Sequence, residues 1–366
     1  MKKNLLIIAI TALFLSGCSL TVGSATVGTK TADSSLFLST NSGESWRSVA
    51  SIPSTNGRAQ SIGEVNVNLM SFDPQDHLAL YLATFDRGLF YTYNATKGWN
   101  QVAALPQATI SDVKVDPRDK CVVYAALANR LYRSDDCTRT WKQVYFDNDG
   151  RVSVNTIAVD QQNSRNIYIG TSRGEIIKSI DGGEDWRTIQ RLGKGIYRLI
   201  ISPLDSRLIF VATTNNEIYS FTSNSQTNPS NSENIETNFN VDNWLDLDDV
   251  IGDMNIGSSF RDLIISPKDG TIFLASEKMI LRSPDNGISW ETLDLIPPEN
   301  GATINAIAVN PSDSNDIYYV TDTTFYRSSD AGVSWKTNKL PTKRAGRELL
   351  IDPQTPNVMY LGTIKR

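Results

Sequence analysis

Tryptophan recurs at a nearly regular spacing along the whole chain. The seven tryptophans follow one another at intervals of 42 to 58 residues: Trp46, Trp99, Trp141, Trp186, Trp244, Trp290 and Trp335. Five of them end an octad of one pattern, namely STNSGESW, SDDCTRTW, SIDGGEDW, SPDNGISW and SSDAGVSW, and TYNATKGW is a weaker sixth copy. Self-similarity at such a period indicates a repeat architecture rather than one ordinary globular core.

A second signal recurs once per unit, an apolar run that closes in Asp-Pro or a related pair. Its closing residues are Asp73, Asp116, Asp160, Ser202, Ser266, Asn310 and Asp352. Two short β-rich runs follow each of them, for example CVVYAAL and LYRS. Each unit therefore predicts four short strands, A to D. Four strands per unit of about 40 to 45 residues are typical of β-propellers, so we predict an all-β fold, a single seven-bladed propeller over residues 35–366.

The two ends of the chain complement each other. The C-terminus supplies strands A and B (RELLIDP and NVMYLGT) without an octad. The N-terminus supplies strands C and D (SLFLST and SWRSVA) with no Asp-Pro strand before them. Joined, they make the seventh, last blade. Such an interlock closes the ring and removes open sheet edges.

The octads resemble the Asp-box (BNR) motif, S-x-D-x-G-x-[ST]-W, of sialidases, sortilin-type receptors, xyloglucan-cleaving glycosidases and photosystem II assembly factors. The resemblance implies structural C-to-D hairpins on the rim away from the usual active face, with calcium binding as the alternative. We expect the acidic residue to accept amides two or three residues on, the glycine to be left-handed and the tryptophan N–H to be bonded. The box residues are Ser39, Asn41, Gly43, Trp46, Ser134, Asp136, Trp141, Ser179, Asp181, Gly183, Trp186, Ser283, Asp285, Gly287, Trp290, Ser328, Asp330, Gly332 and Trp335.

The second blade departs from the box pattern and also carries two of the three cysteines. Thr138 stands where glycine is expected, Cys137 lies inside the same turn, and Cys121 begins strand B. An exported protein meets an oxidising compartment, so we predict a Cys121–Cys137 disulfide, with two separate buried thiols as the alternative. A closed loop of this size would contribute about 3 kcal/mol and offset a poorer turn.

The N-terminus predicts export and membrane attachment. Two lysines, an apolar run and small residues form a signal peptide over residues 1–17, and LSGC resembles the lipobox of bacterial lipoproteins. That resemblance implies acylation of Cys18 and places the protein in the cell envelope, anchored to a membrane and facing outside the cytoplasm. A plain secretion signal is the alternative. Residues 18–34 read as a lipidated flexible spacer, and the Ser/Asn-rich residues 222–243 as a disordered insertion in the propeller.

Charge and composition narrow the candidate functions. The formal net charge is −5 and no basic run occurs, which argues against nucleic acid as a partner. His77 is the single histidine, so a Ser-His-Asp triad and a histidine metal cluster are disfavoured. We predict no catalytic residues, no metal and no cofactor.

Charged residues gather where propeller ligands usually bind, at the strand A starts and B-to-C loops around the central channel. The candidate partner-binding residues are Arg87, Arg173, Arg198, Arg261 and Arg347. The same region also contains the acidic residues Asp112, Asp262 and Glu348. One interpretation is that these residues form a polar rim that contacts only solvent. The alternative is that they form a docking face for a membrane or envelope protein or a glycan. The predicted function is thus a membrane-tethered interaction or assembly module, and a surface glycoside hydrolase or sialidase-like protein is the alternative.

Overall fold

The computed structural model describes residues 33–54, 60–95, 97–223, 241–247, 251, 254, 256, 257, 259–296, 301 and 303–366. The chain divides into two units, Met1–Ala32 and Asp33–Arg366, and the description concerns the second. The predicted signal peptide, Cys18 and most of the spacer lie outside the described residues. None of the described segments forms a helix with the length and apolarity that crossing a bilayer requires.

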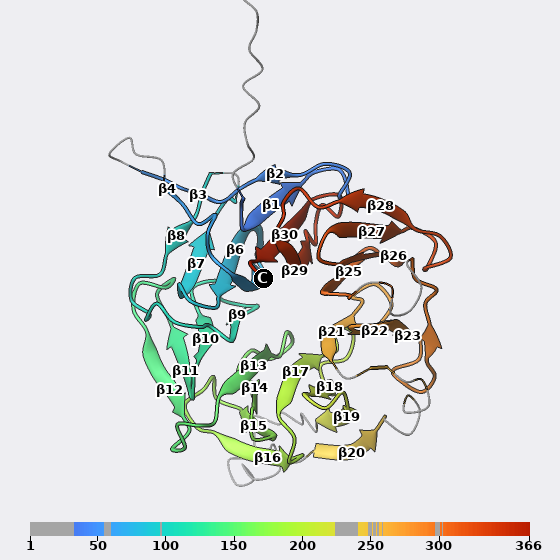
Figure 1. Cartoon of the computed structure of the whole chain (residues 1–366). Coiled ribbons are helices and arrows are strands. Elements are labelled where there is room, and N and C mark those ends of the chain that lie inside the picture. The colour runs from blue at the N-terminus through green and yellow to red at the C-terminus, as the bar shows by residue number, and fades with distance from the viewer. Residues whose placement is uncertain are drawn as a thin grey trace, which may run out of the picture. The chain divides into compact units, whose positions relative to one another are not determined.

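The second unit is a ring of seven four-stranded antiparallel sheets, which confirms the predicted fold (Figure 1). Blades 1 to 3 consist of β5 (Val67–Asp73), β6 (Asp76–Thr84), β7 (Leu89–Thr92) and β8 (Asn100–Gln101); β9 (Asp112–Val115), β10 (Val123–Leu127), β11 (Arg130–Ser134) and β12 (Lys142–Phe146); and β13 (Val154–Val159), β14 (Ile167–Thr171), β15 (Glu175–Ser179) and β16 (Arg187–Arg191). Blades 4 to 6 consist of β17 (Ile196–Ile201), β18 (Leu208–Thr213), β19 (Ile218–Ser223) and β20 (Val241–Asp246); β21 (Phe260–Ile265), β22 (Ile272–Ser276), β23 (Ile280–Ser283) and β24 (Glu291–Thr292); and β25 (Ala306–Asn310), β26 (Asp313–Val320), β27 (Thr324–Ser328) and β28 (Lys336–Lys339).

Blade 7 joins the two ends of this unit, as the sequence predicts. It consists of β29 (Ala345–Ile351), β30 (Met359–Ile364), β1 (Leu36–Ser39) and β2 (Arg47–Ser48), and a short hairpin of β3 (Ser51–Ile52) and β4 (Gln60–Ser61) follows. Strand β1 pairs with β30 in a register that places Phe37 opposite Leu361. The innermost strands contact one another around the whole ring, including β29 with β5. The ring is therefore closed by main-chain hydrogen bonds and has no open edge at its seam.

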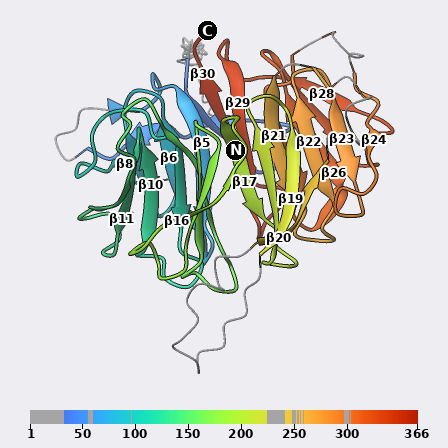
Figure 2. The same cartoon turned by 90° about the horizontal axis from the view of Figure 1, so that it is seen from below.

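The apolar core is divided among the gaps between blades. In the described part of the chain, each pair of neighbouring blades encloses one cluster of buried side chains, seven clusters in all. Strand B of each blade is buried on both faces along most of its length, because a blade is covered by a neighbour on each side. Figure 2 shows this stacking from the side. This arrangement explains why the central strands read as almost continuous apolar runs.

Polar residues that the seam brings together also hold blade 7 against blade 1. Arg344 is 2% exposed and donates to the Val65 carbonyl oxygen and, at 3.0 Å, to Thr363 Oγ1. His77 Nδ1 lies 2.7 Å from Oδ2 of Asp352, which is 2% exposed. Arg344 and Val65 are 279 residues apart and His77 and Asp352 are 275 apart, so nothing in the repeat pattern predicts these two contacts.

Two side chains of each Asp-box, the serine in first place and the acidic residue or asparagine in third place, hold the turn through hydrogen bonds. The serine Oγ in first place donates to the acidic residue and accepts the amide four residues on, as in the 2.8 Å contact of Gly332 N with Ser328. Asp330 in turn accepts the Ser334 amide at 2.9 Å. The predicted offset of two or three residues was therefore wrong for most boxes, because the left-handed pair in mid-turn brings the fourth amide back onto the carboxylate. Gly43 needs its φ of 84° and also the space, since a Cβ there would overlap the Phe325 ring.

The expectation that every box tryptophan N–H is bonded was only partly right. Trp186 and Trp335 donate across blades to the carbonyl oxygens of Val144 and Asp294, at 2.9 and 2.7 Å. The buried Nε1 atoms of Trp46 and Trp141 have no partner among the described residues.

The Asp-Pro signal also has a structural explanation. Asp73 accepts the Gln75 amide at 2.8 Å. Equivalent contacts two residues on occur at Asp116, Asp160, Ser202, Ser266, Asn310 and Asp352. The motif therefore stabilises each A-to-B turn.

Two predicted boundaries need correction. Thr222 and Ser223 belong to β19, and residues 241–243 belong to β20, which pairs with it, so the insertion is at most residues 224–240, outside the described part. Ser34 was predicted to end the spacer, but it is 3% exposed and its Oγ lies 2.7 Å from Ser48 Oγ. The seam contacts of the propeller begin before residue 35.

Candidate functional site

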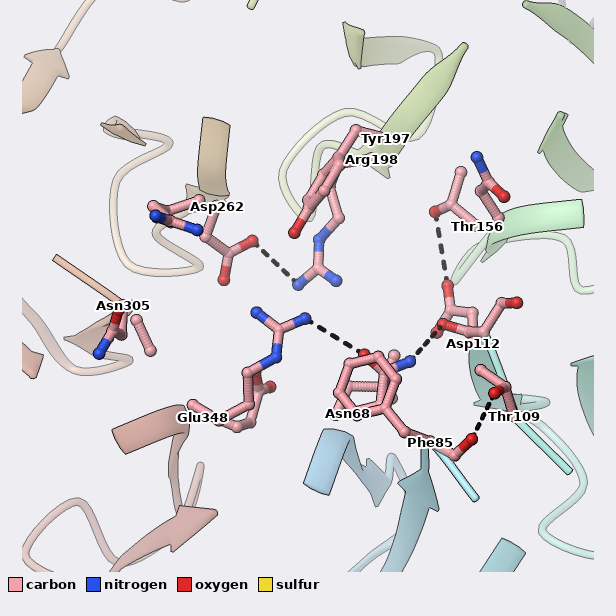
Figure 3. Close-up of a pocket in the computed structure, with 16 residues that line it drawn as sticks. Asn68, Phe85, Thr109, Asp112, Thr156, Tyr197, Arg198, Asp262, Asn305 and Glu348 are labelled. Atoms are coloured by element: carbon pink, nitrogen blue, oxygen red, sulfur yellow. Dashed lines mark hydrogen bonds and ion pairs between the residues drawn. The ribbon is translucent and has the colours of Figure 1, made fainter. Parts of the chain in front are cut away.

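A cavity of about 290 Å³ opens at one end of the central channel, and all seven innermost strands contribute to it. Near the start of each strand, or just before it, these lining residues include Asn68, Asp112, Thr156, Arg198, Asp262, Ala306 and Glu348. Figure 3 shows polar side chains from opposite sides of the ring facing one another across this space. We call this space the mouth cavity.

Backbone bulges explain why so many charged groups reach the mouth cavity. The pairing of innermost strands with their neighbours skips one residue in five blades of the described structure: Asn68, Asn155, Tyr197, Arg261 and Arg347. A bulge re-aims the side chains around it. Consecutive residues such as Arg261 and Asp262 therefore both line the cavity, whereas regular alternation would send them to opposite faces.

Arg198 and Asp262 form an ion pair across neighbouring blades. Arg198 Nη2 lies 3.2 Å from Asp262 Oδ1, and both side chains are largely buried. The Asp262 carboxylate raises the pKa of Arg198 above its ordinary value, against the effect of burial. Asp262 therefore balances the charge of Arg198, and the ion pair joins blade 4 to blade 5.

The other two mouth arginines form no ion pair with a carboxylate of the described residues. Arg347 Nη2 donates to Asn68 Oδ1 at 3.2 Å, and its guanidinium carbon lies 5.6 Å from the centre of the Phe85 ring. Arg261 forms neither an ion pair nor a hydrogen bond with the described residues, and its Nε is buried without a partner. A buried donor without a partner is costly, so these two cations are the groups most ready to receive an anionic ligand.

Glu348 is the unusual acid of the cavity. Burial, and secondarily the Asp262 carboxylate, raise the pKa of Glu348 to about 7, although Arg198 and Arg347 act in the opposite direction. The side chain of Glu348 has no hydrogen bond or ion pair to any residue of the described part. Near neutral pH its carboxyl group is therefore divided between the neutral and the charged form.

Asp112 has a structural role in the same ring. It is 1% exposed, and its oxygens accept the amides of Val113 and Ile157, both at 2.8 Å. The second of these bonds connects blade 2 to blade 3. Lys114 Nζ lies 3.2 Å away and neutralises the carboxylate.

The structure separates the five arginines predicted to bind a partner. Arg198, Arg261 and Arg347 come together in the mouth cavity, but Arg87 and Arg173 do not line it. Arg173 is held by Asp147 and Glu175, with N–O distances of 2.8 and 2.6 Å. Arg87 lies instead in a small separate pocket beside the β3–β4 hairpin. The prediction placed all B-to-C loops at the channel, but among the B-to-C loops only the one between β6 and β7 contributes a residue, Phe85, to the described lining of the cavity.

The cysteine pair and the possible metal ligands were the remaining candidates for a chemical role. Cys121 and Cys137 are joined by a disulfide, and the Cys137 amide donates to the Cys121 carbonyl at 3.1 Å. Within the described ranges no group of three or more His, Cys, Asp or Glu side chains is arranged to hold a metal ion. The mouth cavity can therefore offer cations, one titrating acid and the Tyr197 and Phe85 rings to a ligand.

Comparison with known proteins gives the fold a context. No family model and no curated protein sequence matches the chain. Among solved structures, the GH74 xyloglucanase from Xanthomonas campestris superposes with a TM-score of 0.63 and 17% identity, over 87% of this chain and 52% of the enzyme. The chain thus spans about half the length of that enzyme, and the same holds for the GH74 enzyme of Niastella koreensis, with a TM-score of 0.61 and 15% identity over 82% of this chain.

Two smaller proteins match over nearly their whole length. YCF48 bound to a D1 peptide superposes with a TM-score of 0.59 and 16% identity, over 86% of this chain and 94% of YCF48. YCF48 from Cyanidioschyzon merolae gives a TM-score of 0.58 and 12% identity, over 86% and 98% of the two chains. At these identities the likeness concerns the fold, and this chain is a seven-bladed β-propeller with four-stranded blades whose structural neighbours include YCF48 and the GH74 propellers.

Proposed function

We propose that this chain is a membrane-tethered, extracytoplasmic propeller that binds a segment of a partner protein at the mouth cavity. The observation that carries the proposal is the pair of uncompensated cations, Arg261 and Arg347, in a cavity built by all seven blades. The structure of YCF48 with a D1 peptide supports peptide binding in general, because that propeller has the same fold and nearly the same length.

The start of the described chain is consistent with a tether on this side. The Thr363 amide donates to the Ser35 carbonyl at 2.8 Å, and Ala345, at the start of β29, pairs with Ile364. Residues 33–35 therefore lie at the end of the ring where the innermost strands begin. A tether that enters the propeller at Asp33 would attach at the same end of the ring as the mouth cavity, which favours a partner at the membrane surface.

The partner test compares two arginine variants. The double variant Arg261→Ala/Arg347→Ala should lose a partner that wild-type protein recovers from solubilised native membranes after cross-linking. Arg207→Ala is the control, because Arg207 is an exposed arginine paired only with Asp205. A synthetic peptide from the identified partner should then bind the double variant at least about tenfold more weakly, since hydrogen bonds to charged groups contribute about 1.5–3 kcal/mol each. Equal recovery by both variants would refute binding at the mouth.

The tether has its own test. Cys18→Ser should abolish incorporation of radiolabelled palmitate and move the protein from the membrane fraction to the soluble fraction. An unchanged membrane fraction with no label in the wild type would reject the lipid anchor while leaving the binding proposal intact.

A second candidate function, glycoside hydrolysis, is favoured by one observation. Glu348 with its raised pKa and Asp262, which is ion-paired with Arg198, give the mouth cavity two carboxyl groups in different environments. Such a pair is what glycosidases use as acid and base or nucleophile. Cleavage of chromogenic xylo- or cello-oligosaccharides that is lost in Glu348→Gln would establish this function. No cleavage by the wild type at pH 5 to 8 would exclude these substrates.

A further inference from the structure

A groove on the opposite rim of the propeller lies between blades 1 and 2. It has a volume of about 410 Å³ and is separate from the mouth cavity. Tyr91 and Tyr93 of blade 1 form one wall, the segment Gln101–Ala104 lines it further, and Cys137–Arg139 of blade 2 form the other wall. We call it the tyrosine groove.

Both walls of the tyrosine groove are the places where the Asp-box pattern fails. In blade 1 the octad reads TYNATKGW, and Tyr93 stands in its second place with 54% of its surface exposed. In blade 2, Thr138 replaces the glycine of the box and adopts a φ of 70°. Two irregular boxes in neighbouring blades thus face the same space.

The turn of blade 2 is costly, and the disulfide holds it in place. A residue with a Cβ costs roughly 1–2 kcal/mol in the left-handed conformation, and a β-branched residue is a genuine outlier there. The four other complete boxes place glycine at this position, with φ between 84° and 97°. Strained residues that the surrounding structure retains tend to occur at functional sites. What threonine adds here is a hydroxyl group in the wall of the groove.

The polar groups of the groove are mainly unused donors. The hydroxyls of Tyr91, Tyr93 and Thr138 donate no hydrogen bond to a described residue. Burial and the neighbouring Tyr91 raise the pKa of Tyr93, so its hydroxyl keeps its proton at neutral pH. Arg139 donates one N–H to the Asp136 carbonyl oxygen at 3.2 Å, and its side chain makes no further hydrogen bond with the described residues. The two tyrosine rings meet edge to face, with centroids 5.2 Å apart and planes at 61°.

We propose that the tyrosine groove binds a proline-rich peptide segment in the polyproline II conformation. Aromatic-lined grooves suit this helix because proline rings pack against the aromatic faces. A polyproline II segment has no internal hydrogen bonds, so its carbonyl oxygens accept bonds from the three hydroxyls. Arg139 selects for an acidic residue at the flank of the segment. Because the hydroxyls can also accept hydrogen bonds, a cello-oligosaccharide is the competing ligand in the test.

The test uses a fluorescein-labelled peptide of about eight prolines, which span roughly 25 Å at about 3.1 Å per residue, with glutamates at both ends. Fluorescence anisotropy follows its binding to the mature full-length propeller. The wild type should bind saturably. Tyr93→Phe and Thr138→Gly should each weaken binding about fivefold, the effect of losing one hydrogen bond of about 1 kcal/mol. Thr138→Gly is the decisive variant because it relieves backbone strain, so weaker binding cannot come from misfolding.

The matched controls distinguish proline recognition in the groove from a general effect of charge or of an unstructured peptide. Arg139→Glu should weaken binding, whereas Arg151→Glu, the same charge change at an exposed site of blade 2, should not. A peptide with the same glutamates but with glycine and serine in place of the prolines should not bind. The proposal is overturned if the glycine-serine peptide binds equally well, if Thr138→Gly and Tyr93→Phe bind like the wild type, or if cellohexaose saturates the groove while the proline peptide does not bind.

Discussion

Glu348 makes the stability of the propeller depend on pH, and Glu348→Gln should remove that dependence. The pKa of Glu348 is about 7 in the folded protein, against 4.5 for an ordinary glutamate. The folded state thus binds this proton more tightly than the unfolded chain. The benefit of the neutral carboxyl is fully present below pH 4.5 and is lost as the pH rises through 7, where the folded protein must hold a buried charge.

The magnitude follows from the size of the pKa shift. Each pKa unit corresponds to about 1.36 kcal/mol, so the full shift would cost about 3 kcal/mol above pH 7. Solvent reaches Glu348 through the mouth cavity and screens part of this cost, so we expect a difference of about 2 kcal/mol. Glutamine keeps the shape of the neutral acid and carries no charge at any pH.

Urea denaturation followed by tryptophan fluorescence tests this reasoning. At pH 5 the wild type and Glu348→Gln should have nearly equal free energies of unfolding, and at pH 8.5 the variant should be more stable by about 2 kcal/mol. Glu291→Gln, on an exposed outer strand, is the control and should behave alike at both pH values. A difference that is the same at pH 5 and pH 8.5, or a variant that is less stable at pH 8.5, would refute the burial argument.

Three further substitutions test the disulfide-bonded turn and the seam. Thr138→Gly should raise the free energy of unfolding by about 1 kcal/mol in the oxidised protein, because a strained left-handed residue is replaced by glycine; a lower thermal midpoint would contradict this. Replacing Cys121 and Cys137 together by serine should lower stability by about 3 kcal/mol, and dithiothreitol should then shift the thermal midpoint of the wild type but not of the variant. His77→Ala should lower stability by about 1–2 kcal/mol because Asp352 loses a buried partner; an unchanged urea midpoint would show that the seam does not depend on this contact.

The mouth cavity shows where sequence analysis reached its limit. The charged residues at the strand starts were correctly identified as a group, since Arg198, Arg261 and Arg347 all line the cavity. Which of these arginines is paired with a carboxylate could not be predicted, because Arg198 and Asp262 lie on strands of different blades, 64 residues apart in the sequence. The bulges were also missed, although pairs of consecutive polar residues at the strand starts, such as Arg347 and Glu348, were a usable signal for them.

The sequence by itself determined the structural features that form within a single blade. The octads, the Asp-Pro turns and the apolar strands act over a few residues, so their chemistry is readable from spacing, and the number of blades and the closure follow from counting them. What only the tertiary structure decided lies between blades: the seam contacts of Arg344 and His77, the unpartnered Arg261, the raised pKa of Glu348 and the tyrosine groove. Each of these depends on which side chains the closed ring brings face to face, and that juxtaposition has no trace in the local pattern.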